Sequence, residues 1–479
     1  MREVFRSLAR RARGPQPARP VGRRATDAGM DDDLAHGVLE LGLRVGVAML
    51  ALGAPAADAS GTIARVVRWF GLVGCQVDLT FTSITLSYDR PSAAPMTVMR
   101  VVGERAHDFG RLTDVVAMVD RVTSAPHDPA DRPVIVERAH AELDRIVVAP
   151  RPFPRWVVTL LLAGLAAAVA VMLGGGPAVA LVAAGTTATI DRLAWALLRW
   201  GLPPFFVQAA AAATATLVAV ALLLTVPRLP FDLAVLPPSL VVASGIIVLL
   251  AGMSLVGAAE DAISGFPLTA SARTFEVVVL TLGLVVGVGG VLDIARRFGV
   301  PMEIIAVPRN TTPVVVQVLA AAAVAAAFAA ASYARRRAVL VAGVAGGFAW
   351  TVMVLLQSAG LGAAVASPGA ALVVGLLGEL VGLRVGVPAI VTSVCGVVPL
   401  LPGLAIYRAL FVLVNEPGGF LDGATGLLGA AMVGLGLAGG VTLGEFLAAP
   451  LRRARRIARR AVLRPRRPRI EQRGAEAQD

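Results

Sequence analysis

Charged side chains are scarce in the long apolar segments of this chain, and the few near them are the first candidates for chemistry. An ionisable group in hydrocarbon is costly, so it usually lines a polar pathway or binds a solute. Asp261, Arg273 and Glu276 lie close together in sequence, where one apolar segment ends and the next begins. Arg273 and Glu276 are three residues apart and therefore share one face of a helix. The cluster offers both signs of charge, as recognition of a zwitterion with one carboxylate and one ammonium group requires.

Further candidates lie at helix breaks and at the ends of apolar segments. Pro399 and Pro402 interrupt one segment, and the carbonyls freed by such a break can coordinate a solute or ion. Packing kinks, interfacial anchors and helix caps remain the alternative interpretation for each of these residues. The predicted substrate and proton pathway comprises Ser254, Asp261, Arg273, Glu276, Glu379, Thr392, Pro399, Pro402 and Glu445.

The composition indicates which kind of scaffold must position these residues. The 479 residues are 56% apolar and 16% charged, with a mean hydropathy of +0.75. A soluble domain carries about 25% charged residues, a disordered chain is poorer in apolar residues, and a disulfide scaffold is richer in cysteine. The chain is therefore predicted to be an all-α polytopic membrane protein with a small soluble domain attached.

Ten apolar segments have roughly the length needed to span a bilayer. Pro238, Gly245 and Gly252 in the fourth segment correspond to Pro388, Gly396 and Gly403 in the ninth. Five is an odd number, so consecutive five-helix copies insert in opposite orientations, which is the inverted-repeat plan of many secondary transporters. Similar composition alone could also produce this likeness. The predicted spans are 156–175, 177–197, 205–226, 236–258, 274–293, 311–332, 338–357, 361–382, 386–408 and 423–448.

Residues 31–150 are predicted to form a small α+β domain outside the bilayer, because no 18-residue apolar run occurs there. Alternation of β-branched residues predicts a strand, with a hairpin partner after the turn. Helical periodicity predicts two helices before the strands and two after them. The expected elements are helices Leu34–Leu52 and Asp58–Phe70, strands Gln76–Tyr88 and Met96–Val102, and helices Asp114–Thr123 and Pro133–Val147.

Both ends of the chain are strongly basic. Every basic residue is arginine, and residues 1–30 hold eight of them against Glu3 and Asp27. Residues 1–30 have no apolar run and are predicted to be disordered. Basic tails beside membrane helices are topology signals and contacts for anionic lipid, which we favour over nucleic acid. The predicted parts are the tail 1–30, the domain 31–150, the halves 156–293 and 311–448, and the tail 451–479, with both tails cytoplasmic.

Enzyme and cofactor motifs are scarce. No P-loop pattern and no GxSxG occur, which argues against an ATP-driven pump and a common class of hydrolase. The four histidines all precede residue 150 without the spacing of a zinc site. We therefore expect no enzyme activity, cofactor or metal. A membrane-tethered hydrolase built on the soluble domain remains an alternative, since His, Asp and Ser occur there without diagnostic spacing.

Several sequence blocks carry a likeness to a known family. They include RVGVAMLALGA and TFTSITLSY in the soluble domain, and GLPPFFVQ, SGFPLTASARTFE and TLGLVVGVGG in the first predicted half. The most specific block is LGELVGLRVGVPAIVTSVCGVVPLLPGLAIYRAL, ending in the Pro-Gly-x-x-x-Tyr-Arg of Pro402 to Arg408. Over about residues 34–450 the chain resembles the threonine/serine exporter family of bacteria.

This resemblance implies export of L-threonine and L-serine across the bacterial plasma membrane, driven by the proton motive force. It supplies no site motif that can be carried over residue by residue. The alternative solute is a small dicarboxylate such as succinate, or another small metabolite, although a dianion should need more positive charge than Arg273 and Arg384 provide. The partners expected are the amino acid, protons and anionic lipid, and association of the chain with itself stays open.

Overall fold

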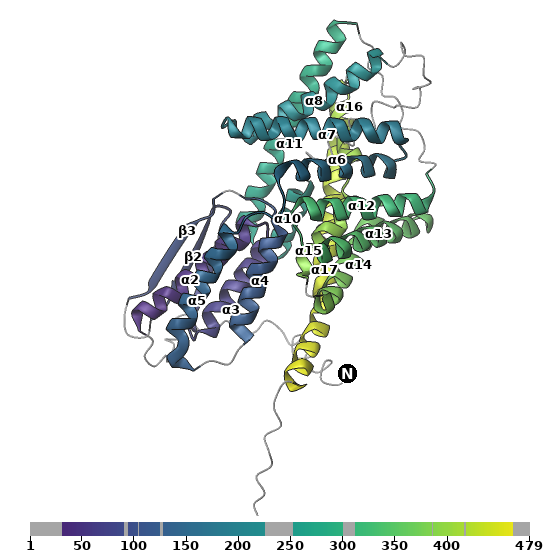
Figure 1. Cartoon of the computed structure of the whole chain (residues 1–479). Helices are drawn as coiled ribbons and strands as arrows, with labels where there is room; N and C mark the ends of the chain where they lie inside the picture. Colours follow the sequence, from purple (N-terminus) through teal and green to yellow (C-terminus); the bar gives the residue numbers. More distant parts are fainter. Residues whose placement is uncertain are drawn as a thin grey trace, which may run out of the picture.

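The computed structural model describes residues 31–90, 94–103, 105–124, 128–225, 252–299, 312–385, 387–415 and 418–462. An α+β domain, formed by helices α2–α5 and one sheet, lies to one side of a larger helical part that contains the long helix α17 (Figure 1). In this view α6, α7, α12 and α13 run across the direction of α8, α11 and α17. Residues 1–30 and 463–479, including most of both predicted tails, lie outside the described part.

Helices α2 (Asp32–Ala51) and α3 (Ala56–Trp69) form the centre of the α+β domain. Glycine on α2 permits their close approach, because a Cβ on Gly46 would lie 2.4 Å from Ile63 Cδ1. Helices α4 (Phe109–Ser124) and α5 (Arg132–Val148) follow the sheet, with the short turn η1 (Pro129–Asp131) between them. These helices lie near their predicted positions, although α4 begins five residues earlier than expected.

The sheet corrects one prediction. The stretch expected to be a single strand is two strands, β1 (Cys75–Leu79) and β2 (Ser83–Tyr88), joined by a tight turn at residues 80–82. The turn is stabilised by Thr80, whose Oγ1 accepts from the backbone N–H of Ser83 at 3.1 Å. Strand β3 (Met96–Val101) pairs antiparallel with β2, as predicted, giving the order β1-β2-β3. Continuous alternation concealed the turn because hydroxyl residues fit both a strand and a turn.

The larger part consists of helices of membrane-spanning length and several shorter ones. Three helices follow the α+β domain directly: α6 (Arg155–Met172), α7 (Pro177–Arg199) and α8 (Pro204–Thr225). The hairpin of α10 (Gly252–Ile263) and α11 (Pro267–Arg297) follows. The remaining elements are α12 (Val314–Ala331), α13 (Arg336–Ser358), α14 (Ala363–Val385), α15 (Ala389–Val397), η4 (Val398–Leu400), α16 (Gly403–Asn415) and α17 (Phe420–Val462).

Within the described residues, eight helices are long and apolar enough to cross a membrane, or nine if α15 and α16 form one bent span. One of the eight is α2, which instead packs inside the α+β domain, where most of its apolar residues are buried. Helix α7 falls short of the same criterion because Asp191 and Arg192 lower its hydropathy. Most of the predicted fourth span, with Pro238 and Gly245, lies outside the described residues. The structure therefore supports a multi-pass membrane protein, and ten crossings stay a prediction.

The apolar core of the α+β domain continues into the larger part. Leu39, Ile63 and Phe109 belong to the same buried cluster as Ala338 of α13 and Val391 of α15. The loop before α13 is held by the first turn of α4: Phe109 N–H donates to the Ser332 carbonyl at 2.9 Å, and Arg335 forms an ion pair with Asp114 at 2.5 Å. The domain is thus packed against the helices rather than tethered by a linker.

Candidate functional site

The α10–α11 hairpin brings Asp261 and Arg273 together, as the sequence suggested. Gly265, with φ of +90°, reverses the chain after α10, and Pro267 starts α11 without needing an N–H donor. Arg273 Nη1 then lies 3.3 Å from Asp261 Oδ2. Gly257 leaves room for this guanidinium, because a Cβ there would stand 2.6 Å from Nη1. The hairpin therefore positions a buried pair of opposite charges.

Asp261 also contacts the α+β domain. Its side chain is fully buried, and Oδ1 accepts a 3.0 Å hydrogen bond from the backbone N–H of Ala56, the first residue of α3. Pro55, before it, supplies no side-chain cap, so Asp261 caps α3 from another part of the chain. The carboxylate is stabilised by the guanidinium on one side and by the positive end of α3 on the other. Asp261 Oδ2 accepts no hydrogen bond among the described residues.

Glu276 lies one turn beyond Arg273 on α11, and its side chain is exposed. The structure thus brings two members of the predicted cluster into contact and leaves the third at its edge. Ser254 lies seven residues before Asp261, which puts it two turns away on the same face of α10. These four positions form the hairpin part of the candidate site.

Two residues of the α+β domain have pKa values that the charge of Arg273 shifts, and sequence reasoning missed both. Arg105 Nη2 donates to the carbonyl of Phe81, and its guanidinium lies over the Phe81 ring at 3.8 Å. The pKa of Arg105 is lowered to about 10, chiefly by burial and then by the charge of Arg273, while the charges of Glu276 and Asp261 oppose the shift. Burial, and then Arg273, also lower the pKa of His107. Both residues follow β3 in a segment without a motif, so the sequence offered no signal.

A second group of predicted residues gathers around α15. Ser393 Oγ donates to Glu445 Oε1 of α17 at 2.8 Å, and Gly378 of α14 allows close approach because its Cβ would stand 3.0 Å from Ser393 Oγ. The neighbouring Thr392 is buried, and its hydroxyl has no hydrogen-bond partner among the described residues. Glu379, on α14, is 6% exposed. The first half of the bent span thus carries two buried hydroxyl groups, one of which is bonded to a carboxylate of α17.

Glu260 precedes Asp261 on α10. Helix α10 packs on α17, which carries Glu445, so the hairpin and the polar residues beside α15 belong to neighbouring helices.

The predicted helix break occurs. Helix α15 ends at Val397, a 3₁₀ turn contains Pro399, and α16 begins after Pro402, with a bend of 48° between the two parts. The two prolines remove the donors that would bond the carbonyls of Cys395 and Val398. Those carbonyls accept instead from Val398 and Leu401 N–H groups. Local bonds thus take up the two freed acceptors, which weakens the expectation that they serve a solute or ion.

Asp191 and Arg192 of α7 form a separate charged group that contacts α6. Asp191 forms an ion pair with Arg155 and accepts from Thr159 Oγ1 at 2.7 Å. Arg192 donates to the Arg155 carbonyl at 3.2 Å. These contacts join the start of α6 to the last turns of α7, so the pair has a packing role. The side chain of Arg384 lies outside the described part.

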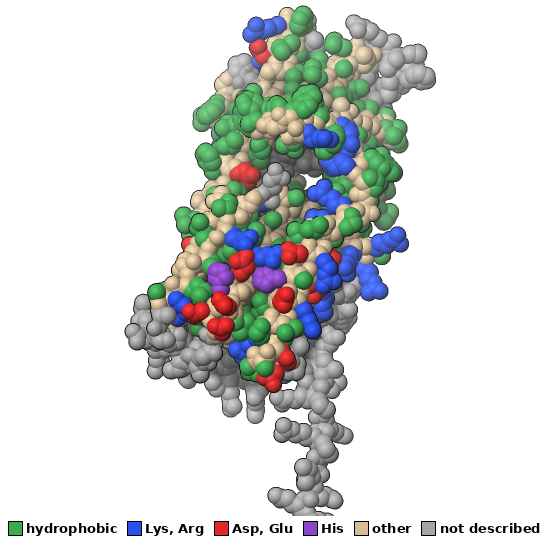
Figure 2. Space-filling view, turned by 60° about the vertical axis from the view of Figure 1, so that its left-hand side comes forward, with side chains coloured by type: hydrophobic (Ala, Val, Ile, Leu, Met, Phe, Trp, Pro, Cys, Tyr) green, Lys and Arg blue, Asp and Glu red, His purple; other side chains and the backbone are tan. Residues whose placement is uncertain are grey.

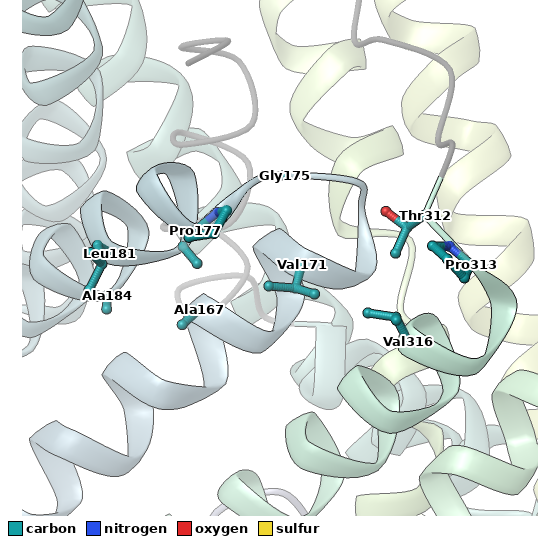
Figure 3. Close-up of a pocket in the computed structure, with 10 residues that line it drawn as sticks. Ala167, Val171, Gly175, Pro177, Leu181, Ala184, Thr312, Pro313 and Val316 are labelled. Atoms are coloured by element: carbon teal, nitrogen blue, oxygen red, sulfur yellow. The ribbon is translucent and has the colours of Figure 1, made fainter. Parts of the chain in front are cut away.

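One cavity, of about 780 Å³, lies between α6, α7 and the start of α12 (Figure 3). Apart from the Thr312 hydroxyl its lining is apolar, with Val171, Leu181 and Val316 among the residues that surround it. It contains none of the predicted site residues and no charged group, so it does not suit a zwitterion. Within the described residues, no group of three or more His, Cys, Asp and Glu side chains is arranged to hold a metal ion.

Charged side chains gather at the α+β domain and along its junction with the helices, whereas the opposite end of the molecule is mainly hydrophobic in this view (Figure 2). Two histidines of the α+β domain have contacts that suit packing. His140 accepts from Arg44 and donates to the Gly37 carbonyl. The ring of His107 lies beside those of Phe109 and Phe328.

Comparison with known proteins agrees with the sequence blocks. A threonine/serine exporter family model matches residues 40–295, and a second, described as Threonine/Serine exporter, ThrE, matches residues 317–447. A protein of Mycobacterium tuberculosis named "Probable threonine/serine exporter" is 40% identical over 463 residues, covering 94% of this chain and 84% of that protein. The "Threonine/serine exporter" of Corynebacterium glutamicum is 34% identical over 453 residues, covering 93% and 88%. No solved structure is significantly similar. The chain belongs to the threonine/serine exporter family.

Proposed function

We propose that this protein is a secondary transporter that exports L-threonine and L-serine across the bacterial plasma membrane, driven by the proton motive force. The observation that carries the proposal is the buried Asp261–Arg273 pair at the junction of the α+β domain and the helices. Family membership and the names of the two relatives support the solute class.

The Asp261–Arg273 pair can bind a zwitterion if its two members separate and each pairs with one charged group of the solute. An amino acid entering beside the hairpin offers its carboxylate to Arg273 and its ammonium group to Asp261 or Glu276, replacing one ion pair by two. The 3.3 Å separation without a hydrogen bond at Asp261 Oδ2 makes this exchange less costly than opening a bidentate pair. The unpartnered hydroxyl of Thr392 is a candidate for contact with the solute's own hydroxyl group deeper in the helices.

The contacts between helices support an inverted repeat of two five-helix halves. The first half would comprise α6, α7, α8, the segment ending in α10, and α11. The second would comprise α12, α13, α14, the bent α15–α16 span, and α17. In each half the first helix packs on the second, the second on the third, and the third and fourth on the fifth. Between halves, α10 packs on α17 and α11 on α16, the reciprocal contacts expected of a two-fold relation.

The arginines support a cytoplasmic location for the α+β domain and both termini. Arg155, Arg273 and Arg335 all lie at the domain side of the helices, where they contact Asp191, Asp261 and Asp114. The C-terminal end of α17 points to the same end of the molecule as the domain (Figure 1). Positive charge marks the cytoplasmic side of membrane proteins, and the basic tails would contact anionic lipid there.

For proton coupling, Glu276 is the better of two candidates. Asp261 is held by both Arg273 and the start of α3, whereas Glu276 is exposed at the mouth of the site. Protonation of Glu276 would remove the negative charge that holds the ammonium group, which permits the return step. The acidic residues Glu379 of α14 and Glu445 of α17, two helices beside α15, disfavour the alternative, a dicarboxylate solute, because a dianion would meet repulsion there.

The test is uptake of labelled threonine by inside-out membrane vesicles, which follows export from the cytoplasmic face. We expect uptake that increases with an imposed pH gradient, competition by serine and none by succinate. Glu276→Gln should lose the response to the gradient and keep exchange of labelled for unlabelled threonine. The proposal is wrong if vesicles containing the protein take up threonine no faster than vesicles from a strain lacking it.

A further inference from the structure

The start of helix α3 covers the carboxylate of Asp261. Both Asp261 and Ala56 are fully buried, and the Ala56 N–H donates to Asp261 Oδ1 at 3.0 Å. On the other side, Arg273 Nη1 lies 3.3 Å from Asp261 Oδ2. Each carboxylate oxygen therefore faces a positive group, and neither is in contact with solvent. In this arrangement a solute reaches Asp261 only if the start of α3 moves away.

The Ala56 N–H and the ammonium group of an amino acid are alternative donors to the same carboxylate. The N–H groups at the start of a helix carry partial positive charge and have no acceptor within their own helix. An ammonium group carries a full charge and pairs more strongly with a carboxylate. Pro55 supplies no side-chain cap, so water would take the place of Asp261 at the Ala56 N–H once the two separate. The ammonium group can therefore displace the start of α3.

The α+β domain has a second anchor on the helices, at the loop before α13. Here the Phe109 N–H at the start of α4 donates to the Ser332 carbonyl at 2.9 Å, and Asp114 forms an ion pair with Arg335. The chain itself also joins the domain to α6 through residues 149–154. These connections do not involve α3 or the α10–α11 hairpin. They would hold the domain on the protein while the start of α3 leaves Asp261.

We propose that the contact between the start of α3 and Asp261 is autoinhibitory, so that the α+β domain closes the site until the ammonium group of the solute displaces the Ala56 N–H. This inference rests on the proposed function and adds a gate to it. Asp261 exchanges one donor for another, so the buried carboxylate keeps a positive partner in both states. The domain moves away from the hairpin and stays attached at α4.

The experiment measures thiol labelling of the purified full-length protein by N-ethylmaleimide. Ala56→Cys places the thiol at the covered contact, in a Cys75→Ser background because Cys395 is fully buried. Saturating threonine should raise the labelling rate about fivefold, which is the change in an equilibrium that one capping contact typically gives. N-acetylthreonine, which lacks the ammonium group, should leave the rate unchanged.

The matched control is Val67→Cys on the same helix. Val67 is buried and faces α2, because a Cβ on Gly42 would lie 3.1 Å from Val67 Cγ1. Movement of the domain away from the hairpin leaves this contact intact, so labelling at position 67 should be slow with and without threonine. A threonine effect of the same size at both positions would indicate general loosening of the domain and overturn the inference.

Two other outcomes would also overturn it: labelling of Ala56→Cys that threonine does not change, and equal acceleration by threonine and N-acetylthreonine. If Ala56→Cys does not fold, hydrogen exchange of the wild-type protein decides. Threonine should then speed exchange in the peptide that contains Ala56 and not in the one that contains Phe109. Absence of threonine uptake by vesicles containing the wild-type protein refutes the proposed function, whereas uptake with unchanged labelling refutes this inference alone.

Discussion

The packing of α14 on α17 yields a prediction whose size follows from the structure. Gly440 of α17 lies against the backbone of α14, because a Cβ on it would stand 2.3 Å from the Pro368 carbonyl oxygen. Ordinary contact begins at 3.4 Å, so Gly440→Ala requires the helices to separate by about the 1.1 Å difference. Backbone cannot rotate away as a side chain can, so the strain falls on the whole interface.

Overpacking of this kind costs about 1–3 kcal/mol. Replacing glycine by alanine within a helix stabilises the folded state by about 0.5–1 kcal/mol, which offsets part of that cost. From the midpoints of these two ranges we expect Gly440→Ala to lower the free energy of unfolding by about 1 kcal/mol. Gly429→Ala, on the same helix with no atom within 4 Å of its Cβ position, should leave stability unchanged or raise it slightly. The difference between the two variants isolates the close approach from helix propensity.

The assay is unfolding of the purified protein in mixed micelles with increasing dodecyl sulfate, followed by far-ultraviolet circular dichroism. A second pair on α11 repeats the test independently. Gly287→Ala would place a Cβ 2.1 Å from the Ala209 carbonyl oxygen of α8, whereas Gly290→Ala meets no atom within 4 Å. Equal stability of Gly440→Ala and Gly429→Ala would show that α14 and α17 are not in backbone contact, and the reasoning would fail.

Three further predictions follow from the junction and the α+β domain. Asp261→Ala should destabilise the protein by about 3–5 kcal/mol, because it leaves Arg273 without its buried partner. Asp293→Ala should cost less than about 1 kcal/mol, because the ion pair of Asp293 with Arg297 is exposed. Chemical unfolding of the two variants measures both losses of stability. Since burial lowers the pKa of His107 in the folded state, the unfolded chain binds more protons below about pH 6.5, so stability should fall on acidification. This fall should be smaller in His107→Gln than in His36→Gln, as measured by melting temperature between pH 7 and 5. Burial raises the pKa of Cys75 to about 11, so iodoacetamide at pH 8 should label it slowly in the folded protein and at the ordinary thiol rate after unfolding; equal rates would contradict the buried environment.

Local sequence patterns predicted most elements because their signals act over short distances. The proline break before α16 was predicted from residue type. The start of α11 was not, because the predicted span began at residue 274 and the helix begins at Pro267. Asp261 and Arg273 were found because an ionisable residue stands out in apolar sequence. The strand boundary at Thr80 was missed because its hydroxyl stabilises a turn without interrupting the β pattern.

The part of the site that came only from the structure depends on tertiary contacts. Nothing in the sequence around Ala56 indicates that its N–H is capped by a residue 205 positions away. Arg105 is one of many arginines in the chain, and its contact with Phe81 depends on the turn between β1 and β2. Long-range pairing of this kind carries no periodicity, so no single-sequence pattern could have found it.

The buried cluster shared by Ile63 of the α+β domain with Ala338 and Val391 of the helices has a practical consequence for truncation. A protein shortened to begin at Arg155 would keep every helix of membrane-spanning length outside that domain, yet one flank of α13 and α15 would lose its cover. That flank consists mainly of small aliphatic side chains on the side of the helices that the domain covers, a surface that water solvates poorly. We therefore expect such a fragment to aggregate on extraction, however gentle the detergent.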